Sequence, residues 1–286
     1  MPNAPQPNIV LIMTDQHRFD RLSCVSGGIP RTPHIDRIAQ EGVRFVNAYT
    51  PSPVCAPARA AIKSGMYPPG CGVVGNWVPF ADDVELVTQR LSRCGYQAAM
   101  AGKLHFVPAL RRFGFDWKAL HDAPYSIYAH DDGYSDYVHW LRESRRASGL
   151  PDPVARFDED ESAFQRDDWY RFIMGSNFRR EEEHDIVWTT HEAMRFLDER
   201  EARRPFFLYV SYFGPHQPFD APEPWHSLYD PEEIELPPQF DADMRENPVF
   251  AATCGERATH FKALFDEKAY RTMLAAYYGQ VSMIDH

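Results

Sequence analysis

The run Phe206-Phe207-Leu208-Tyr209-Val210-Ser211-Tyr212-Phe213 is the strongest strand prediction in the chain, and it decides the fold class. It follows Pro205, a residue that ends the preceding helical pattern. A shorter apolar run covers Asn8 to Met13 near the start of the chain. Continuous apolar runs of this length are typical of strands that are buried in a parallel sheet. Both runs are therefore predicted to be strands of such a sheet.

Helical patterns alternate with strands along the chain. Residues 183–203 place Ile186, Ala193 and Leu197 on one face, and their acidic first turn and basic last turn suit the helix dipole. The other predicted helices are 33–41, 57–63, 83–94, 134–147 and 268–285, a further strand is predicted at 96–101, and the composition of 43–49 favours β structure. This alternation predicts an α/β domain with a mainly parallel central sheet flanked by helices.

One catalytic domain is predicted to span 1–286, with two irregular stretches in it. Residues 116–182 are polar and aromatic, and we expect an insertion near the rim of an active site. Residues 214–248 are rich in Pro and are predicted to be a long surface excursion. The last helix reaches His286 without Gly, Pro or a polar tail, whereas an α/β alternation would continue with a strand. We therefore expect the chain to end within a domain, truncated at its C-terminal side.

The composition excludes several classes of protein. The 286 residues carry 30 Lys and Arg against 41 Asp and Glu, a net charge of −11, and 44% of them are hydrophobic. These values are typical of a globular protein, and the acidic balance argues against nucleic acid or an anionic membrane as a partner. No apolar run approaches the ~20 residues of a membrane-spanning helix. Met1 to Asn8 has no Lys or Arg for a secretory signal, so a cytoplasmic protein is predicted.

The five cysteines are odd in number, scattered and without Cys-x-x-Cys spacing. A reducing compartment is therefore expected, without a disulfide scaffold or a zinc ribbon. Four of them are predicted to be structural thiols, namely Cys24, Cys71, Cys94 and Cys254. Cys55 differs, because Pro57 and Arg59 follow it at the start of a predicted helix. A helix N-terminus stabilises a thiolate or an anionic ligand, and the Arg adds a fork for an oxyanion.

Three further clusters follow predicted strands, at the edge where open parallel sheets bind ligands. Asp15-Gln16-His17 follows the first strand, and its carboxylate suits a hard cation or a turn. Gly102-Lys103-Leu104-His105 follows the strand 96–101, with Lys103 and His105 on the same side of an extended segment. Gly214-Pro215-His216-Gln217-Pro218 follows the strand 206–213. Each alone also suits a turn or surface residue, but together with Cys55 they predict a crevice for covalent transfer of sulfate or phosphate.

These motifs resemble those of the type I sulfatases of the alkaline-phosphatase superfamily. Cys55-Ala56-Pro57-Ala58-Arg59 matches the signature Cys-x-Pro-x-Arg. Gly95-Tyr96 with Gly102-Lys103-Leu104-His105 matches the Gly-Tyr … Gly-Lys-x-His block, and Pro215-His216-Gln217-Pro218-Phe219 matches Pro-His-x-Pro-Phe. Tyr277 to Asp285 resembles the helix before the family's second metal motif. The similarity therefore spans residues 8–285.

The resemblance implies a modified nucleophile and a metal ion. In the family this Cys is oxidised to formylglycine, by a formylglycine-generating enzyme or an anaerobic sulfatase-maturating enzyme. A divalent cation, Ca²⁺ or Mn²⁺, is then implied to be bound by Asp15, Gln16 and a hydroxyl of the hydrated formylglycine at position 55. Asp15-Gln16 stands where most of the family has Asp-Asp, and it resembles the branch of choline-sulfatase and phosphonate monoester hydrolase.

The resemblance also assigns roles around a small sulfate, phosphonate or phosphate ester. Arg59 and Lys103 are implied to stabilise the formylglycine and the developing charge. His216 is implied to assist the leaving alcohol, and His105 to take a proton from the second hydroxyl, so that sulfate leaves and the aldehyde is regenerated. Asn76, in the loop after the signature helix, is a further candidate for contacting the substrate, together with Lys103 and His216.

Two features depart from the family pattern. Ser64-Gly65-Met66 stands where the family has Thr-Gly-Arg. The family's second metal pair falls beyond His286, since Asp285-His286 belongs to the preceding helix.

A phosphonate or phosphodiester hydrolase is the alternative within the superfamily, and a truncated, inactive chain that binds an anion or a partner is the alternative outside it. A Cys/His hydrolase would leave Asp15 and Lys103 unexplained. The sequence predicts no oligomeric state.

Overall fold

The computed structural model describes residues 6–122, 135–151, 174, 180–237, 240 and 266–286. The chain divides into two compact units. The sheet unit comprises Met1–Gln16, Val43–Asp160 and Glu182–Gly214, and the helix unit comprises His17–Gly42, Glu161–Glu181 and Pro215–His286. Every strand of the described chain belongs to the sheet unit.

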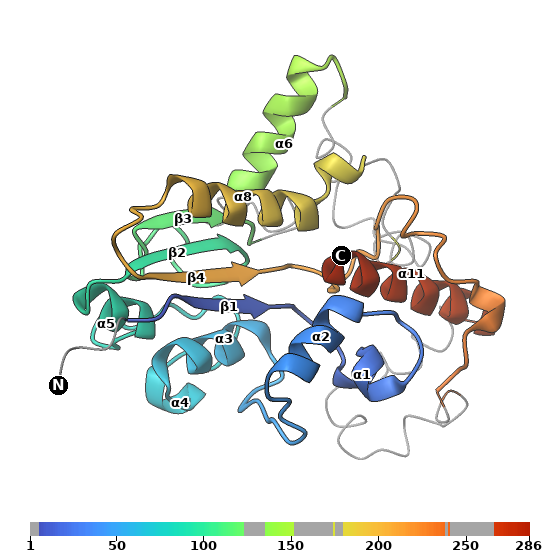
Figure 1. Ribbon diagram of the computed structural model, residues 1–286, viewed down its shortest axis with the longest axis horizontal. Coiled ribbons are helices and arrows are strands. Elements are labelled where there is room, and N and C mark those ends of the chain that lie inside the picture. Colours follow the sequence, from blue (N-terminus) through green and yellow to red (C-terminus); the bar gives the residue numbers. More distant parts are fainter. Residues whose placement is uncertain (1–5, 123–134, 152–173, 175–179, 238–239, 241–265) are drawn as a thin grey trace. The chain divides into compact units, whose positions relative to one another are not determined.

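The described part of the sheet unit is built on four parallel strands in the order β1-β4-β2-β3. They are β1 (Ile9–Met13), β2 (Gln97–Gly102), β3 (Trp117–Leu120) and β4 (Phe206–Ser211). β4 lies between β1 and β2, and its Leu208 pairs with Val10 on one side and Ala99 on the other. All six residues of β4 are buried, as its continuous apolar run predicts. The predicted parallel sheet flanked by helices is confirmed (Figure 1).

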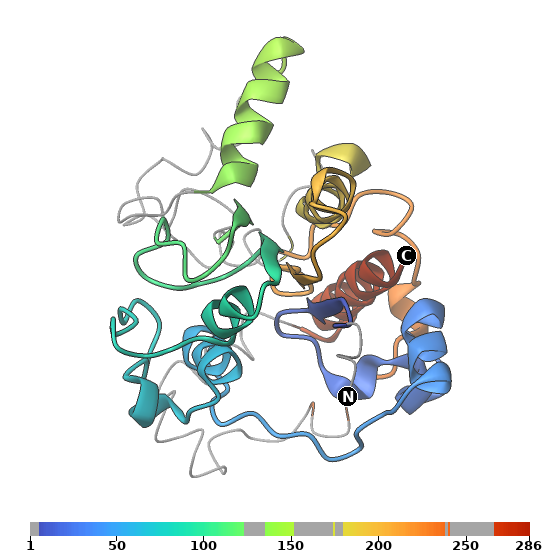
Figure 2. The same ribbon diagram turned by 60° about the vertical axis from the view of Figure 1, so that its left-hand side comes forward.

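Helices cover both faces of this sheet (Figures 1 and 2). The helices of the sheet unit are α3 (Cys55–Ser64), α4 (Pro68–Cys71), α5 (Val87–Arg93), α6 (Asp136–Ala147) and α8 (Asp185–Glu199), with the 3-10 helix η4 (Glu181–Glu183) at its boundary. α8 packs on one face, where the rings of Phe196 and Phe206 lie 6.0 Å apart. α3 lies on the other face, where Ala56 and Ala60 join a core with Phe207 and Tyr209 of β4. Small side chains therefore let α3 run close to β4.

Two expectations about strands were wrong. Residues 43–49 form no strand, and Phe45 and Tyr49 are 78% and 89% exposed. β1 is not buried on both faces, since Val10 and Ile12 are 51% and 57% exposed while the alternate residues pack on the core. β1 is the edge strand of the described sheet and has β4 as its one described neighbour. Composition favours β structure in both segments, but burial depends on which neighbours cover a strand.

The stretch 116–182, expected to be an irregular insertion, begins inside the sheet. β3 pairs with β2, with Ala101 opposite Ala119. α6 then follows, close to the predicted helix 134–147. Residues 123–134, 152–173 and 175–179 of this stretch lie outside the described residues, as do Cys254 and most of the excursion beyond residue 237.

Most helix boundaries fall near the predicted ones. α3 begins at Cys55, two residues before the expected start at Pro57, and Gly65 ends it with φ +69°. α5 is shorter than the predicted helix 83–94. Two short helices that were not predicted, η1 (Phe19–Arg21) and α1 (Ser23–Ser26), follow β1. A single turn carries too little periodicity to be recognised in the sequence.

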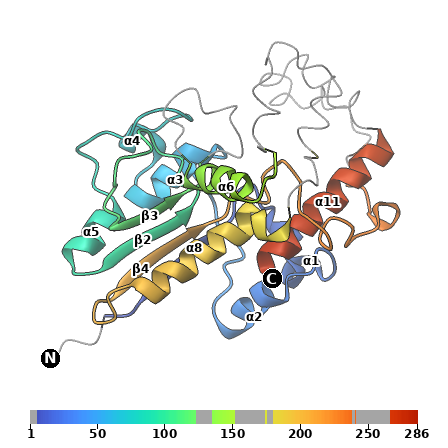
Figure 3. The ribbon, with the colours of Figure 1, turned by 90° about the horizontal axis from the view of Figure 1, so that it is seen from above.

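The helix unit packs α2 (Pro33–Glu41) against α11 (Glu267–Asp285), with α1 and η5 (Pro231–Glu233) beside them (Figure 3). The Asp285 carboxylate accepts the backbone N–H groups of His34 and Ile35 at 3.0 and 2.7 Å. It therefore caps α2, whose N-cap residue Thr32 makes no such bond. No helix in the described ranges has both the length and the apolar character that crossing a bilayer requires.

Candidate active site

The buried carboxylate of Asp15 is the centre of the candidate active site. Asp15 follows β1, and its backbone N–H donates to the carbonyl of Gly214, after β4, at 3.1 Å. Its Oδ2 lies 2.6 Å from Lys103 Nζ and 3.1 Å from Arg59 Nη2, and its Oδ1 lies 3.6 Å from Cys55 Sγ. Side chains from three of the four predicted clusters therefore meet at the carboxyl ends of the strands, where ligands bind in such sheets.

Arg59, one helical turn after Cys55, is held by hydrogen bonds from both of its terminal nitrogens. Nη1 donates to the Lys103 carbonyl at 2.7 Å, the Tyr209 hydroxyl at 3.0 Å and the Ser211 hydroxyl at 2.8 Å. Nη2 donates to Asp15. The side chain is 3% exposed. A planar guanidinium presents its donors in a fixed fork, so this network fixes the position of one positive charge.

Lys103 extends from a sharp bend at the end of β2. Gly102 before it has φ +98°, and a Cβ at that position would overlap the carbonyl oxygen of Ser211. The bend therefore requires glycine. The backbone N–H of Lys103 donates to that same oxygen at 2.8 Å, and the ammonium lies 4.3 Å from the centre of the Phe213 ring. The ammonium is thus held between a carboxylate and an aromatic face.

Cys55 is the first residue of α3, and its half-buried side chain is a free thiol. Burial raises the pKa of this thiol and the Asp15 carboxylate raises it too, whereas Lys103 and Arg59 act in the opposite direction. The net effect is a raised pKa, which disfavours the thiolate form of Cys55. A thiolate is the form of cysteine that attacks substrates, so this environment counts against a Cys/His hydrolase.

Asn76 contacts the backbone beside Cys55. Its Oδ1 accepts the N–H of Ala56 at 3.1 Å. The first turn of a helix leaves such N–H groups without an intrahelical acceptor, so Asn76 caps α3 from outside the helix. Asn76 is itself exposed. Its contact with a substrate remains a prediction.

His105 lies in the loop after Lys103 and next to Trp77. The histidine is buried, its φ is +59°, and its ring meets Trp77 edge-on with centroids 5.3 Å apart. The loop is fixed by Asp122, whose Oδ1 accepts the backbone N–H groups of Leu104 at 2.6 Å and His105 at 2.8 Å. Asp122 was not predicted. It follows β3, so the rule that identified Asp15, a carboxylate directly after a strand, would have found it had β3 been recognised.

Gln16 and His216 are two further predicted site residues whose roles the contacts below do not test. Gln16 is exposed, with φ +59°, directly after Asp15. His216 belongs to the helix unit, and its Nδ1 lies 2.7 Å from the carbonyl oxygen of Gln217. Along the chain, one residue separates His216 from Gly214, the partner of Asp15. The roles of Gln16 as a ligand and of His216 beside the substrate remain predictions.

Two cations and two carboxylates form what we call the charge cluster: Asp15, Arg59, Lys103 and Asp122. Burial raises the pKa of Asp122, while the two N–H groups that it accepts and the nearby Arg59 and Lys103 lower it. Asp15 supplies the negative charge that the buried Arg59 and Lys103 need nearby.

The donor types at Asp15 and Gln16 fit a divalent cation in part. A carboxylate and an amide oxygen are ligands that hard cations such as Ca²⁺ prefer. No group of three His, Cys, Asp or Glu side chains in the described ranges could hold a metal ion. A metal bound here would therefore take its other ligands from water, from the substrate or from residues outside those ranges.

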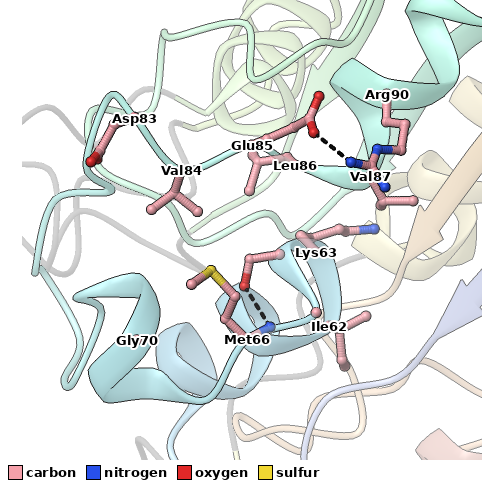
Figure 4. Close-up of a pocket in the computed structure, with 12 residues that line it drawn as sticks. Ile62, Lys63, Met66, Gly70, Asp83, Val84, Glu85, Leu86, Val87 and Arg90 are labelled. Atoms are coloured by element: carbon pink, nitrogen blue, oxygen red, sulfur yellow. Dashed lines mark hydrogen bonds and ion pairs between the residues drawn. The ribbon is translucent and has the colours of Figure 1, made fainter.

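A pocket of about 570 Å³ lies at the C-terminal end of α3, apart from the charge cluster (Figure 4). It is lined by residues of α3, α5 and the segments beside them, including Lys63, Asp83, Glu85 and Arg90. Lys63 is 2% exposed, its Nζ lies 3.1 Å from the centre of the Tyr209 ring, and this nitrogen has no hydrogen-bond partner among the described residues. Burial lowers the pKa of Lys63 to about 7. No residue of the charge cluster lines this pocket.

Comparison with known proteins shows the family. The family model for sulfatases matches residues 7–286. An arylsulfatase of Clostridium perfringens is 31% identical over 290 residues, which cover 98% of this chain and 57% of that protein. A choline-sulfatase of Rhizobium meliloti is 26% identical over 302 residues, which cover 98% of this chain and 52% of that protein. The chain thus spans about half the length of these relatives.

A solved structure shows the same fold. The phosphonate monoester hydrolase of Agrobacterium radiobacter matches with a TM-score of 0.73 at 22% identity, covering 98% of this chain and 57% of that one. The predicted resemblance is confirmed, since the family model covers nearly the whole chain and its signature Cys55 and Arg59 meet Asp15 and Lys103 in one buried site. The chain belongs to the sulfatase family, within the alkaline-phosphatase superfamily.

Proposed function

We propose that this chain carries the catalytic site of a hydrolase that cleaves sulfate esters, with formylglycine made from Cys55 as the nucleophile. One observation supports this above the others: Cys55 Sγ lies 3.6 Å from Asp15 Oδ1, while two buried cations bind Oδ2 of the same carboxylate. A nucleophile beside fixed positive charges suits the transfer of a tetrahedral oxyanion. The arylsulfatase and choline-sulfatase relatives support sulfate as the group transferred.

The raised pKa of Cys55 supports the modification. A neutral thiol is a weak nucleophile, and after attack it would hold sulfate without a second hydroxyl to expel it. Hydrated formylglycine supplies one hydroxyl to attack the ester and a second from which the aldehyde is regenerated. The maturation enzyme, of the formylglycine-generating or anaerobic type, would act on the Cys55 thiol.

Arg59 and Lys103 are proposed to stabilise negative charge on the transferred group. Both are held by the chain before any ligand binds, Arg59 by four hydrogen bonds and Lys103 by the Asp15 carboxylate. Such preorganised charges need no rearrangement as charge develops, which is the usual source of large rate effects. Lys103 would also contact the bound sulfate group.

Asp15 and Gln16 are proposed to bind a divalent cation, Ca²⁺ or Mn²⁺. When bound, the cation would supply Lewis-acid activation of the attacking hydroxyl. Asp15 presents Oδ2 to the side chains of Arg59 and Lys103, and Oδ1 toward position 55. It would therefore connect the metal to both the nucleophile and the charge cluster.

The two histidines are proposed to move protons. His105 would accept the proton of the second hydroxyl, and His216 would assist the departing alcohol. His105 is buried in the loop that also carries Lys103. His216 follows Gly214 closely along the chain, and Asn76 is a further proposed contact of the substrate.

Hydrolysis of phosphonate or phosphate esters is a second candidate, favoured by Gln16. An amide at this position leaves the metal site with one negative charge fewer than the Asp-Asp pair of most sulfatases. Sulfate and phosphonate monoesters each carry one negative charge, so Gln16 favours this candidate through the resemblance of Asp15-Gln16 to the branch that contains phosphonate monoester hydrolase. The fold match to a phosphonate monoester hydrolase is in line with this candidate, although at 22% identity it shows the fold alone.

The test is to produce the protein together with a maturation enzyme, measure the mass of the peptide around Cys55, and assay one aryl sulfate and one aryl phosphonate. We expect an aldehyde mass at position 55 and faster turnover of the sulfate. Cys55→Ala should abolish turnover of both esters. Wild-type turnover by Cys55→Ala would refute the assignment, and faster turnover of the phosphonate would favour the second candidate. Absence of Ca²⁺ and Mn²⁺ binding by calorimetry, with no turnover, would support an inactive anion-binding chain.

A further inference from the structure

The loop from Gly102 to His105 carries two of the proposed site residues in an unusual backbone conformation. Gly102 has φ +98° and His105 has φ +59°. A left-handed conformation at a residue with a side chain costs free energy and persists only where its surroundings enforce it. The hydrogen bond from Lys103 N to Ser211 O holds the beginning of the loop on β4. The end of the loop needs a second restraint.

Asp122 supplies that restraint. A single oxygen, Oδ1, accepts the successive N–H groups of Leu104 and His105 at 2.6 and 2.8 Å. Successive N–H groups that point to one place form a concave site for a negative charge. The carboxylate itself is fixed by the sheet, because the residue before it, His121, donates its N–H to the Gly102 carbonyl at 2.9 Å. The loop and its anchor are therefore connected to the same two strands, β2 and β3.

We infer that Asp122 is a positioning residue of the site: its Oδ1 holds the Lys103–His105 loop so that the Lys103 ammonium meets Asp15 and the His105 ring lies beside Trp77. Asp122 acts through the backbone, and no contact of Asp122 with a substrate is part of the inference. Its effect on turnover rests on the proposed function, whereas its effect on the loop does not.

The hydrogen bond, rather than the negative charge, is the property that matters here. Burial is the largest influence on the pKa of Asp122 and raises it, so this site does not favour a charge strongly. An asparagine keeps an Oδ1 acceptor of the same size and removes the charge. It should therefore hold the loop nearly as well as aspartate, whereas alanine cannot.

A matched control exists at the other end of the same two strands. Asp116 lies just before β3, and its Oδ2 accepts the N–H of Ala98 in β2 at 3.0 Å. This is also a carboxylate that bonds to the backbone across the β2–β3 pair, but at the amino ends of the strands. Asp116→Ala should therefore reproduce any general loss of sheet stability without moving the Lys103–His105 loop.

The experiment measures hydrogen exchange at Leu104 and His105 and the kinetics of aryl sulfate hydrolysis in four proteins: wild type, Asp122→Ala, Asp122→Asn and Asp116→Ala. Asp122→Ala should speed exchange of both amides at least tenfold and lower kcat about 100-fold with a smaller change in KM, because a misplaced catalytic group costs about that much. Asp122→Asn should restore protection and most of kcat. Asp116→Ala should leave both readouts as in wild type.

Two results would overturn the inference. One is wild-type exchange and kcat in Asp122→Ala. The other is equal loss in Asp122→Asn and Asp122→Ala, which would show that the charge and not the hydrogen bond is required. A wild-type protein that hydrolyses neither ester would count against the proposed function alone, because the exchange measurement still decides whether Asp122 holds the loop.

Discussion

Arg59 and Lys63 are one turn apart on α3 and equally buried, but they lie in opposite environments. Arg59, 3% exposed, donates to four oxygen acceptors, one of them the Asp15 carboxylate. Lys63, 2% exposed, has no hydrogen-bond partner for its Nζ in the described ranges and lies over the ring of Tyr209. Burial lowers the pKa of Lys63 to about 7.

The difference shows what keeps a buried charge in place. Burial favours the neutral form of lysine, and only nearby carboxylates or acceptors offset that effect. The first turn of α3 meets Asp15 and the strand ends, so its arginine has partners. The last turn meets the aromatic rings of Phe207 and Tyr209, so its lysine has only their π-faces. The N-terminal end of α3 is built to hold charge, and the C-terminal end tolerates it.

The largest expected effect comes from removing the partner that Arg59 and Lys103 share. Asp15→Ala leaves two buried cations facing one carboxylate fewer, so we expect the free energy of unfolding to fall by about 3–5 kcal/mol. Turnover of the aryl sulfate should be lost with it. Urea unfolding followed by circular dichroism measures the stability. The control is Asp20→Ala, which removes an exposed ion pair with Arg18 and should cost at most about 1 kcal/mol. Equal losses of unfolding free energy in Asp15→Ala and Asp20→Ala would show that the buried ion pairs of Asp15 stabilise the fold no more than an exposed ion pair does.

The next effect concerns Lys63 and the pH dependence of stability. The folded-state pKa is about 7 and the unfolded value is 10.5. Between these values the unfolded chain binds a proton that the folded chain does not, so stability rises with pH across this window, by up to about 1.4 kcal/mol per pH unit. The cost of burying the charge is fully present below about pH 7. The Tyr209 face attracts an ammonium and so opposes the effect of burial, which narrows this pH window from its lower end.

Lys63→Met should remove this rise. The variant should be more stable than wild type at pH 7, and the difference should shrink toward pH 10. The measurement is urea unfolding at a series of pH values. Lys268→Met, at an exposed position of α11, should leave the pH dependence unchanged. A wild-type curve that is flat from pH 7 to 10 would mean that Lys63 keeps its proton and that the Tyr209 face outweighs burial.

The sequence predicted the features that long apolar runs and spaced motifs encode. β1, β2 and β4 follow from such runs, and Asp15, Cys55, Arg59 and Lys103 meet as expected from residues at strand ends and a helix start. β3 was missed because it has only four residues and includes Lys118, whose ammonium donates to loop carbonyls at 2.6 and 2.9 Å. Missing β3 also concealed Asp122.

The different environments of Arg59 and Lys63 could not be predicted from the sequence, and the reason is physical. The spacing of Arg59 and Lys63 places them on one face of a helix together with Ala56 and Ala60. That pattern shows that a charged face exists, but not which of the two cations meets a carboxylate. The answer depends on strands from positions 13 and 209, far away in the sequence, and therefore only the fold supplies it.

The smallest expected effect, on the reactivity of Cys55, tests the electrostatics of the first turn without relying on catalysis. Because burial and Asp15 raise the pKa of this thiol, the unmodified protein should react with iodoacetamide at Cys55 more slowly at pH 7.5 than the unfolded chain does. Asp15→Asn removes a carboxylate that raises this pKa and leaves Lys103 and Arg59, which lower it, so alkylation should become at least severalfold faster. Site-resolved mass spectrometry separates Cys55 from the other thiols, and exposed Cys94 serves as the internal reference. Faster alkylation of Cys55 than of Cys94 in the wild-type protein would contradict this prediction. It would show that Arg59 and Lys103, rather than burial and Asp15, determine the pKa of Cys55.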